Sequence, residues 1–194
     1  MTAPPYDAIV LAGGASRRLG GADKTAVPLA GRAMLDYVVE AVAAAGTVVV
    51  VGPPRPTARV VEWRREEPSG GGPAAGIAAA LPAVTAADVV VVAGDQPLLS
   101  AEVVMSLVTA LRVDPGLDGA AGVDADGRPQ WLVGAWRADA LRGAGLAAGA
   151  ALRDTLGRLR WTAVPLPDGA AVDCDTPDDV RRIAALLTDR SGRR

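Results

Sequence analysis

The sequence predicts an α/β protein: one three-layer α/β/α domain spanning residues 1–194, with helices on both faces of a mostly parallel, doubly wound sheet. Three observations support this prediction. The length of 194 residues suits a single domain with a substantial core. The segments around Ile9, Val49 and Val91 are continuously apolar, as parallel strands covered on both faces are. Segments with helical spacing separate these runs along the chain.

In the first half of the chain, apolar runs that stop at glycine predict strands, and apolar residues three and four apart predict helices. Both apolar runs here meet glycine, at Gly13-Gly14 and at Gly52. Proline suits the first turn of a helix, where its missing N–H is not needed. The predicted elements are a strand at 7–12, a helix at 32–45, a strand at 47–51, a polar stretch at 62–72 and a helix at 73–81.

The second half carries clearer start signals. Ser100 is a predicted N-cap, and Thr176-Pro-Asp-Asp179 places a cap, a proline and two acids at the start of a helix. The Asp124-Ala-Asp-Gly127 segment predicts a turn between two strands. The predicted elements are strands at 88–93, 119–123, 131–136 and 161–166, and helices at 100–112, 138–141, 150–159 and 176–187, with residues 189–194 frayed.

Composition excludes several kinds of chemistry. The chain has no histidine, so His general bases and His-ligated zinc are ruled out. Its one cysteine, Cys174, excludes an internal disulfide and is expected to be a packed strand residue. A net charge of −2, the polar first residues and the short apolar runs predict a cytoplasmic protein without a leader peptide, nucleic-acid partner or membrane span. We expect a monomer or a weak homo-oligomer.

The loop after the first strand is the most informative segment. Gly13-Gly14 lets backbone N–H groups approach phosphate oxygens, and Arg18 and Lys24 add positive charge. Lys24 is the only lysine among 20 basic residues, and a compact ammonium suits a tight phosphate site. An ordinary turn with surface arginines remains the alternative. The spacing fits neither a Walker A loop nor a dinucleotide fingerprint.

Carboxylates at predicted strand ends suggest a metal site. Asp95 follows a buried strand and a glycine, where it could hold Mg²⁺ together with phosphate oxygens and water. Asp173 and Asp175, just before the last helix, form a second acidic pair. For Asp95 and Asp175 the alternative is a turn residue. Trp131 is expected in packing, with a stacking platform for a base or pterin as the alternative.

These features should lie close together. The Gly13-Gly14 loop, Gly52 and Asp95 all follow predicted parallel strands at their carboxyl ends. In doubly wound sheets, ligands bind outside this edge. We therefore predict one phosphate-binding cleft there.

In these motifs, the chain resembles the molybdenum cofactor guanylyltransferase family and its nucleotidyltransferase relatives, which have a Rossmann-like fold. The resemblance spans nearly the whole chain. It rests on four segments: Leu11-Ala-Gly-Gly14 with Arg18-Leu-Gly-Gly-Ala-Asp-Lys24, Gly72-Pro-Ala-Ala-Gly-Ile77, Ala93-Gly-Asp-Gln-Pro-Leu98, and Asp173-Cys-Asp-Thr-Pro-Asp-Asp179.

The resemblance implies roles for individual residues. It implies that Mg²⁺ is the cofactor, held by Asp95 and by Asp175, and that Arg18, Lys24 and Asp95 support catalysis. The usual His-Pro beside the family's acceptor pocket stands here as Pro129-Gln130, which marks an acceptor pocket with Trp131 and Asp173. The positions implied to bind nucleotide are Leu11, Ala12, Gly13, Gly14, Lys24, Gly52, Glu67 and Asp95.

The implied reaction is transfer of GMP from GTP to the phosphate of molybdopterin, with release of pyrophosphate. The attacking phosphate oxygen is already anionic, which agrees with a chain that lacks histidine. Gly94-Asp-Gln-Pro97 and Asp173-Cys-Asp-Thr-Pro177 also resemble the cytidylyl branch. The alternatives are therefore a cytidylyltransferase acting on molybdopterin or on a sugar or alcohol phosphate, and a non-catalytic nucleotide-binding protein.

Overall fold

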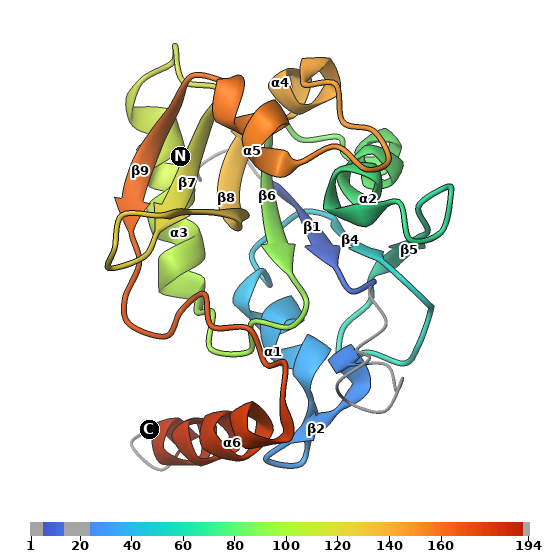
Figure 1. Cartoon of the computed structure of the whole chain (residues 1–194), viewed down its shortest axis with the longest axis vertical. Coiled ribbons are helices and arrows are strands. Elements are labelled where there is room, and N and C mark those ends of the chain that lie inside the picture. The colour runs from blue at the N-terminus through green and yellow to red at the C-terminus, as the bar shows by residue number, and fades with distance from the viewer. Residues whose placement is uncertain (1–5, 14–23, 192–194) are drawn as a thin grey trace.

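A seven-stranded sheet forms the centre of the computed structural model, which describes residues 6–13 and 24–191 (Figure 1). Across the sheet the strands are β5 (Glu62–Arg64), β4 (Val48–Val51), β1 (Asp7–Leu11), β6 (Asp88–Ala93), β8 (Pro129–Arg137), β7 (Gly119–Val123) and β9 (Trp161–Pro165). Strand β8 is antiparallel to both neighbours, and the other neighbouring pairs are parallel. The predicted mostly parallel sheet is confirmed.

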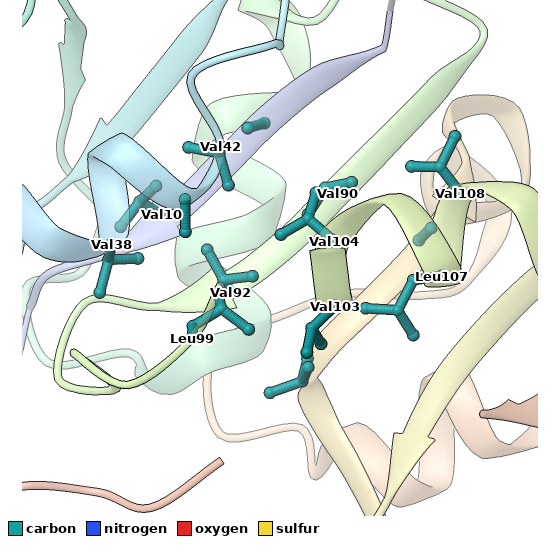
Figure 2. Close-up of a cluster of buried hydrophobic side chains, with 14 of the residues drawn as sticks. Val10, Val38, Val42, Val90, Val92, Leu99, Val103, Val104, Leu107 and Val108 are labelled. Atoms are coloured by element: carbon teal, nitrogen blue, oxygen red, sulfur yellow. The ribbon is translucent and has the colours of Figure 1, made fainter. Parts of the chain in front are cut away.

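Side chains alternate between two apolar cores on the two faces of the sheet. In β6, Val90 and Val92 belong to one core and Val89 and Val91 to the other. Helices α1 (Met34–Ala41) and α3 (Ala101–Val113) cover the first face, where their valines and leucines meet the strands (Figure 2). Helix α2 (Gly72–Ala80), the 3₁₀ helix η3 (Leu81–Ala83) and α4 (Ala138–Gly143) cover the second. This arrangement is the predicted three-layer, doubly wound fold.

A third, smaller core lies beside the sheet. The hairpin of β2 (Pro28–Leu29) and β3 (Arg32–Ala33) packs against the C-terminal helix α6 (Pro177–Ser191), which lies next to β2 at the foot of the molecule (Figure 1). Buried residues of this core include Leu29, Leu98 and Cys174. Cys174 lies in a loop before α6, so its predicted place in a strand is wrong, although it is packed.

Several predicted boundaries differ from the structure. The helix predicted from residue 32 begins at Met34, because Ala30 and Gly31 adopt positive φ angles and turn the chain into the β2–β3 hairpin. The polar stretch contains the edge strand β5. The helix predicted at 150–159 is two short pieces, α5 (Leu152–Thr155) and the 3₁₀ helix η4 (Leu156–Arg158). Helix α6 continues beyond residue 187 into the segment that we expected to fray.

The structure confirms two local predictions, a helix cap and a turn. The hydroxyl oxygen of Ser100 accepts a hydrogen bond from the N–H of Val103, so Ser100 caps α3 as predicted. Gly127, at a φ of +75°, closes the predicted turn between β7 and β8 with an N–H bond to the Asp124 carbonyl. Over the described part of the chain, no helix is both long and apolar enough to cross a bilayer.

Candidate active site

A cleft of about 520 Å³ opens at the carboxyl ends of β1, β4 and β6. This volume falls in the range of about 300–1,000 Å³ that is usual for small-molecule sites. The position is the one predicted for a doubly wound sheet. The residues that line the cleft are Leu11, Gly13, Val51, Glu66, Gly70, Gly72, Pro73, Gly76, Ala93, Asp95, Gln96, Pro129, Gln130, Trp131, Leu132, Leu152 and Asp173.

Two glycines shape the loop that follows β1. A Cβ atom built on Gly52 would lie 2.7 Å from the carbonyl oxygen of Ala12, and one on Gly94 would lie 3.1 Å from that of Leu11. Ala12 and Gly13 therefore pass between Gly52 and Gly94, the glycines that follow the neighbouring strands β4 and β6. Gly13 is exposed and lines the cleft, whereas Ala12 and Gly52 are buried. Gly52 thus packs against the predicted nucleotide loop and does not itself line the cleft.

Two carboxylates from distant parts of the sequence line the same cleft. Asp95 follows β6, and Asp173 lies in the loop before α6. The two segments are tied together: the N–H of Cys174 donates to the Asp95 carbonyl oxygen at 3.1 Å, and Gln96 Nε2 donates to Asp173 Oδ1 at 3.1 Å. The side of the cleft next to β6 therefore carries two carboxylates, and hydrogen bonds join the two segments that supply them.

The acidic pair on the other side is oriented differently from the prediction. Glu66 lines the cleft, and its Oε1 accepts a hydrogen bond from the Gly70 N–H at 3.1 Å. The Glu66 carboxylate oxygens lie 3.6 and 3.8 Å from the place where a Cβ on Gly13 would stand. Glu67, the residue implied by the resemblance, instead lines a separate hollow with Arg65 and Ala148. The acid beside the glycine loop is Glu66.

The start of β8 forms the far wall of the cleft. Gln130 Nε2 donates to Asp124 Oδ2 at 3.0 Å. Asp124 also accepts backbone bonds from Asp126 and Arg128, and the N–H of Arg128 is the main cause of the lowered pKa of the Asp124 carboxyl. The turn between β7 and β8 therefore orients Gln130.

Trp131, on the same wall, is held by its neighbours. The ring of Trp161 packs edge-on against it at a centroid distance of 5.1 Å, and a Cβ on Gly157 would come within 3.3 Å of it. Trp131 thus gives one wall of the cleft an aromatic surface that is packed against its neighbours.

The structure therefore brings six of the predicted site residues to one cleft: Leu11, Gly13, Asp95, Gln130, Trp131 and Asp173. Gly14 and Arg18 lie outside the described residues. Lys24 begins the 3₁₀ helix η2 (Lys24–Ala26), and only its backbone is described. Asp175 is absent from the cleft lining, and its N–H donates to Asp179 Oδ2 at 3.3 Å, beside the start of α6.

Sequence reasoning missed several lining residues. Gln96 could have been found from its place next to Asp95. Glu66 and Glu67 are adjacent acids, and which of them faces the cleft depends on the bond of Glu66 to Gly70. Leu152 reaches the cleft from a short helix far along the chain, and no local pattern marks it.

The oxygen ligands of this cleft fit a hard cation such as Mg²⁺. No group of three or more His, Cys, Asp or Glu side chains gathers at one point among residues 6–13 and 25–189. Mg²⁺ is usually held by one or two carboxylates, with substrate phosphates and water completing its octahedron. Asp95, which lines the cleft, fits that partial set.

A doubly wound sheet with a glycine loop and a strand-end carboxylate at one cleft is the architecture of a nucleotidyltransferase, and the comparisons with known proteins agree. The chain belongs to the MobA-like NTP transferase domain family, whose model matches residues 8–163. The chain is an enzyme of the nucleotidyltransferase class.

Individual relatives cover nearly the whole chain. It is 31% identical over 192 residues to a molybdenum cofactor guanylyltransferase of Shewanella sp. (strain MR-4), with 93% of this chain and 96% of the relative covered. A structure of molybdopterin-guanine dinucleotide biosynthesis protein A from Archaeoglobus fulgidus matches with a TM-score of 0.73 and 25% identity, covering 95% and 100% of the two chains. A 2-C-methyl-D-erythritol 4-phosphate cytidylyltransferase from Thermus thermophilus shares the fold at 19% identity, with a TM-score of 0.70 and coverage of 95% and 99%.

Proposed function

We propose that this enzyme transfers GMP from GTP to the terminal phosphate of molybdopterin in the cytoplasm. An oxygen of the acceptor phosphate attacks the α-phosphorus of GTP. The bond from that phosphorus to the bridging α–β oxygen breaks, and pyrophosphate leaves with the electron pair. No proton transfer is needed, which suits a chain without histidine.

One observation carries the proposal: residues from the glycine loop, the end of β6 and the start of β8 line a single cleft. Gly13 and Glu66 lie on one side, and Gln130 and Trp131 on the other. Asp95 lies on the segment after β6, between the two in the order of the sheet. This arrangement would let the phosphates of two substrates meet near Asp95. The names of the Shewanella and Archaeoglobus relatives support a guanine nucleotide and molybdopterin as these substrates.

The protein's contribution is positioning and charge neutralisation. The exposed backbone at Gly13 can approach phosphate oxygens without obstruction from a Cβ atom. Glu66 stands next to this loop, where it can accept hydrogen bonds from the nucleoside. Lys24 and Arg18 are proposed to neutralise the triphosphate. Gln130 and Trp131 offer a hydrogen-bonding and an aromatic surface to the acceptor.

Asp95, with Asp175 as a second carboxylate, is proposed to hold Mg²⁺. When bound, Mg²⁺ supplies charge that stabilises the phosphates in the transition state. Asp95 is only partly exposed where it follows the end of β6.

A second candidate is transfer of CMP from CTP. The sequence Gly94-Asp-Gln-Pro97 favours it, and the Thermus cytidylyltransferase shows that the same fold accommodates that chemistry. The two candidates differ in the base that is read and share the cleft and the catalytic residues.

The test is pyrophosphate release with molybdopterin and Mg²⁺ in four parallel reactions containing GTP, CTP, ATP or UTP. The proposal predicts release with GTP and little with the others. Release with CTP alone favours the second candidate. No release with any NTP, from a folded protein that still binds one, contradicts the enzyme assignment for this acceptor.

Asp95→Asn should lower kcat by about 100-fold or more, because it removes a charged ligand from the transition state. Asp139→Asn is the matched control: Asp139 is 97% exposed on α4 and outside the cleft. An unchanged kcat in Asp95→Asn would remove Asp95 from the mechanism.

A further inference from the structure

Gln96 combines burial with an incompletely satisfied amide. Its side chain lines the cleft, yet the residue is only 4% exposed. Its Nε2 donates to Asp173 Oδ1 at 3.1 Å and, at 3.5 Å, to the Ala171 carbonyl oxygen. Among the residues that the structure describes, its buried Oε1 has no hydrogen-bond partner. Because both partners of the amide are oxygens, only the nitrogen end can face them.

The loop containing Asp173 is held at two adjacent points. The N–H of Cys174 donates to the Asp95 carbonyl oxygen, and the Cys174 side chain is fully buried with Leu98 and Ile183. This anchor fixes the backbone next to Asp173. Asp173 itself is exposed, and the bond from Gln96 restrains the rotation of its carboxylate.

Stability alone gives a poor account of a glutamine at this position. A buried acceptor without a partner is unfavourable, and a methionine of similar shape would avoid that cost. Glutamine adds two N–H bonds, and the one to Asp173 Oδ1, at 3.1 Å, is shorter than the one to the Ala171 carbonyl oxygen, at 3.5 Å. The Gln96 side chain therefore serves the orientation of that carboxylate.

The location of Asp173 indicates which substrate it meets. Gln96 follows β6, and the neighbouring strand β8 contributes Gln130 and Trp131 to the cleft. Gly13 and Glu66 lie towards β1, β4 and β5, on the opposite side of β6. A carboxylate accepts hydrogen bonds and repels phosphate, so it suits N–H or O–H groups of the acceptor molecule.

We propose that Gln96 is a positioning residue that holds the Asp173 carboxylate towards the acceptor, where it receives hydrogen bonds from N–H or O–H groups of that substrate. This inference rests on the proposed transfer reaction and deepens it. It defines the acceptor as a phosphate ester that also carries hydrogen-bond donors.

The principal variant is Gln96→Met, which keeps the approximate shape and removes the donor. We expect kcat/KM for molybdopterin to fall about tenfold, the usual effect of one hydrogen bond to a charged group. The Kd of Mg²⁺–GTP, measured by calorimetry, should stay within about twofold of the wild-type value, because the nucleotide side is unaltered. The matched control is Tyr37→Phe, which removes a hydroxyl bonded to the Leu29 carbonyl oxygen, both residues lying outside the cleft lining.

A double-mutant cycle with Asp173→Ala separates positioning from packing. In the Asp173→Ala background, Gln96→Met should cause no further loss of kcat/KM. The contact itself can be measured by NMR without turnover. The Gln96 side-chain amide protons should exchange slowly with solvent in the wild type and faster in Asp173→Ala.

Additive losses in the cycle, or a parallel loss of Mg²⁺–GTP affinity, would overturn the positioning role while leaving the transfer reaction in place. Fast amide exchange in the wild type would overturn it too. Failure of the proposed function looks different, since wild-type protein would then release no pyrophosphate with any NTP, and the positioning role would fall with it.

Discussion

At the scale of single residues, Gly52 shows how a buried glycine shapes the loop that follows a neighbouring strand. Its φ angle is +154°, which side chains rarely adopt, and a Cβ atom would stand 2.7 Å from the Ala12 oxygen and 2.8 Å from the Ala12 carbonyl carbon. Any side chain at this position must displace the backbone that leads into Gly13. The backbone at Ala12 and Gly13 therefore requires a glycine at position 52.

Gly52→Ala should therefore lower the free energy of unfolding by about 1–3 kcal/mol and weaken GTP binding about tenfold. Urea unfolding and calorimetry measure the two effects. Gly143→Ala is the control, because no heavy atom lies within 4 Å of its Cβ position and it ends helix α4. Equal effects of the two substitutions would contradict the supporting role of Gly52.

At the scale of elements, helix α6 is anchored by a reciprocal cap. The Oδ2 of Asp179 accepts bonds from the N–H and the hydroxyl of Thr176, and the N–H of Asp179 donates to the Thr176 hydroxyl. The bond from the Thr176 hydroxyl, followed by that from Arg182, lowers the pKa of Asp179 from 3.8 to about 2. The cap is thus strongest when Asp179 is ionised.

The pH dependence of stability follows from this shift. A carboxyl whose pKa is lowered by folding stabilises the folded state above its unfolded pKa, and the stabilisation is lost as the pH falls through the folded value. The stability difference between wild type and Asp179→Ala should be constant at pH 5–7 and shrink between about pH 4 and pH 2. Urea midpoints at several pH values measure it, with exposed Asp189→Ala as the control. A difference that grows on acidification would refute the assignment.

The segment that begins at Lys24 is held from the loop after β4. Arg55 Nη1 donates to Thr25 Oγ1 at 2.6 Å, and its guanidinium lies 5.7 Å from the Trp63 ring centroid. If Lys24 binds the triphosphate as proposed, Arg55→Ala should raise KM for GTP about fivefold, the value of one ordinary hydrogen bond. Arg59→Ala, which breaks an exposed pair with Glu40, should leave KM unchanged. The same KM in both variants would show that this bond is irrelevant to binding.

Individual elements show what sequence patterns can predict. Strand β6 was predicted with its observed bounds, because a buried apolar run ends at Gly94 and begins at a polar residue. Strand β5 was missed, since its three residues, Glu62–Arg64, carry no apolar run and lie at the sheet edge. The β2–β3 hairpin was missed because two-residue strands have no detectable period.

At the scale of the whole molecule, the cleft depends on sheet order more than on local sequence. Asp95 and Gly13 could be predicted because each follows a parallel strand directly. Gln130 and Trp131 reach the same edge for the opposite reason: β8 runs against β6, so the start of β8 lies where β6 ends. The sequence predicted a mostly parallel sheet without showing which strand is reversed. The resemblance supplied Gln130, whereas Trp131 was also considered as a stacking platform from its residue type.

The long-range bonds between the Asp95 and Asp173 segments belong to this scale too. They join parts of the chain more than 70 residues apart, as the separation of 77 between Gln96 and Asp173 shows, and no local pattern predicts them. The acidic side of the cleft is therefore a product of the complete fold.

The most direct measurement of the central claim follows the two ends of the GTP triphosphate through one turnover. Parallel reactions with molybdopterin and Mg²⁺ would contain GTP radiolabelled at either the α- or the γ-phosphorus. The account predicts that the α label appears in the acceptor product and the γ label in pyrophosphate, in equal amounts, and that Asp95→Asn slows the appearance of both by about 100-fold or more. Appearance of the γ label as inorganic phosphate, with no α label in the acceptor, would contradict it.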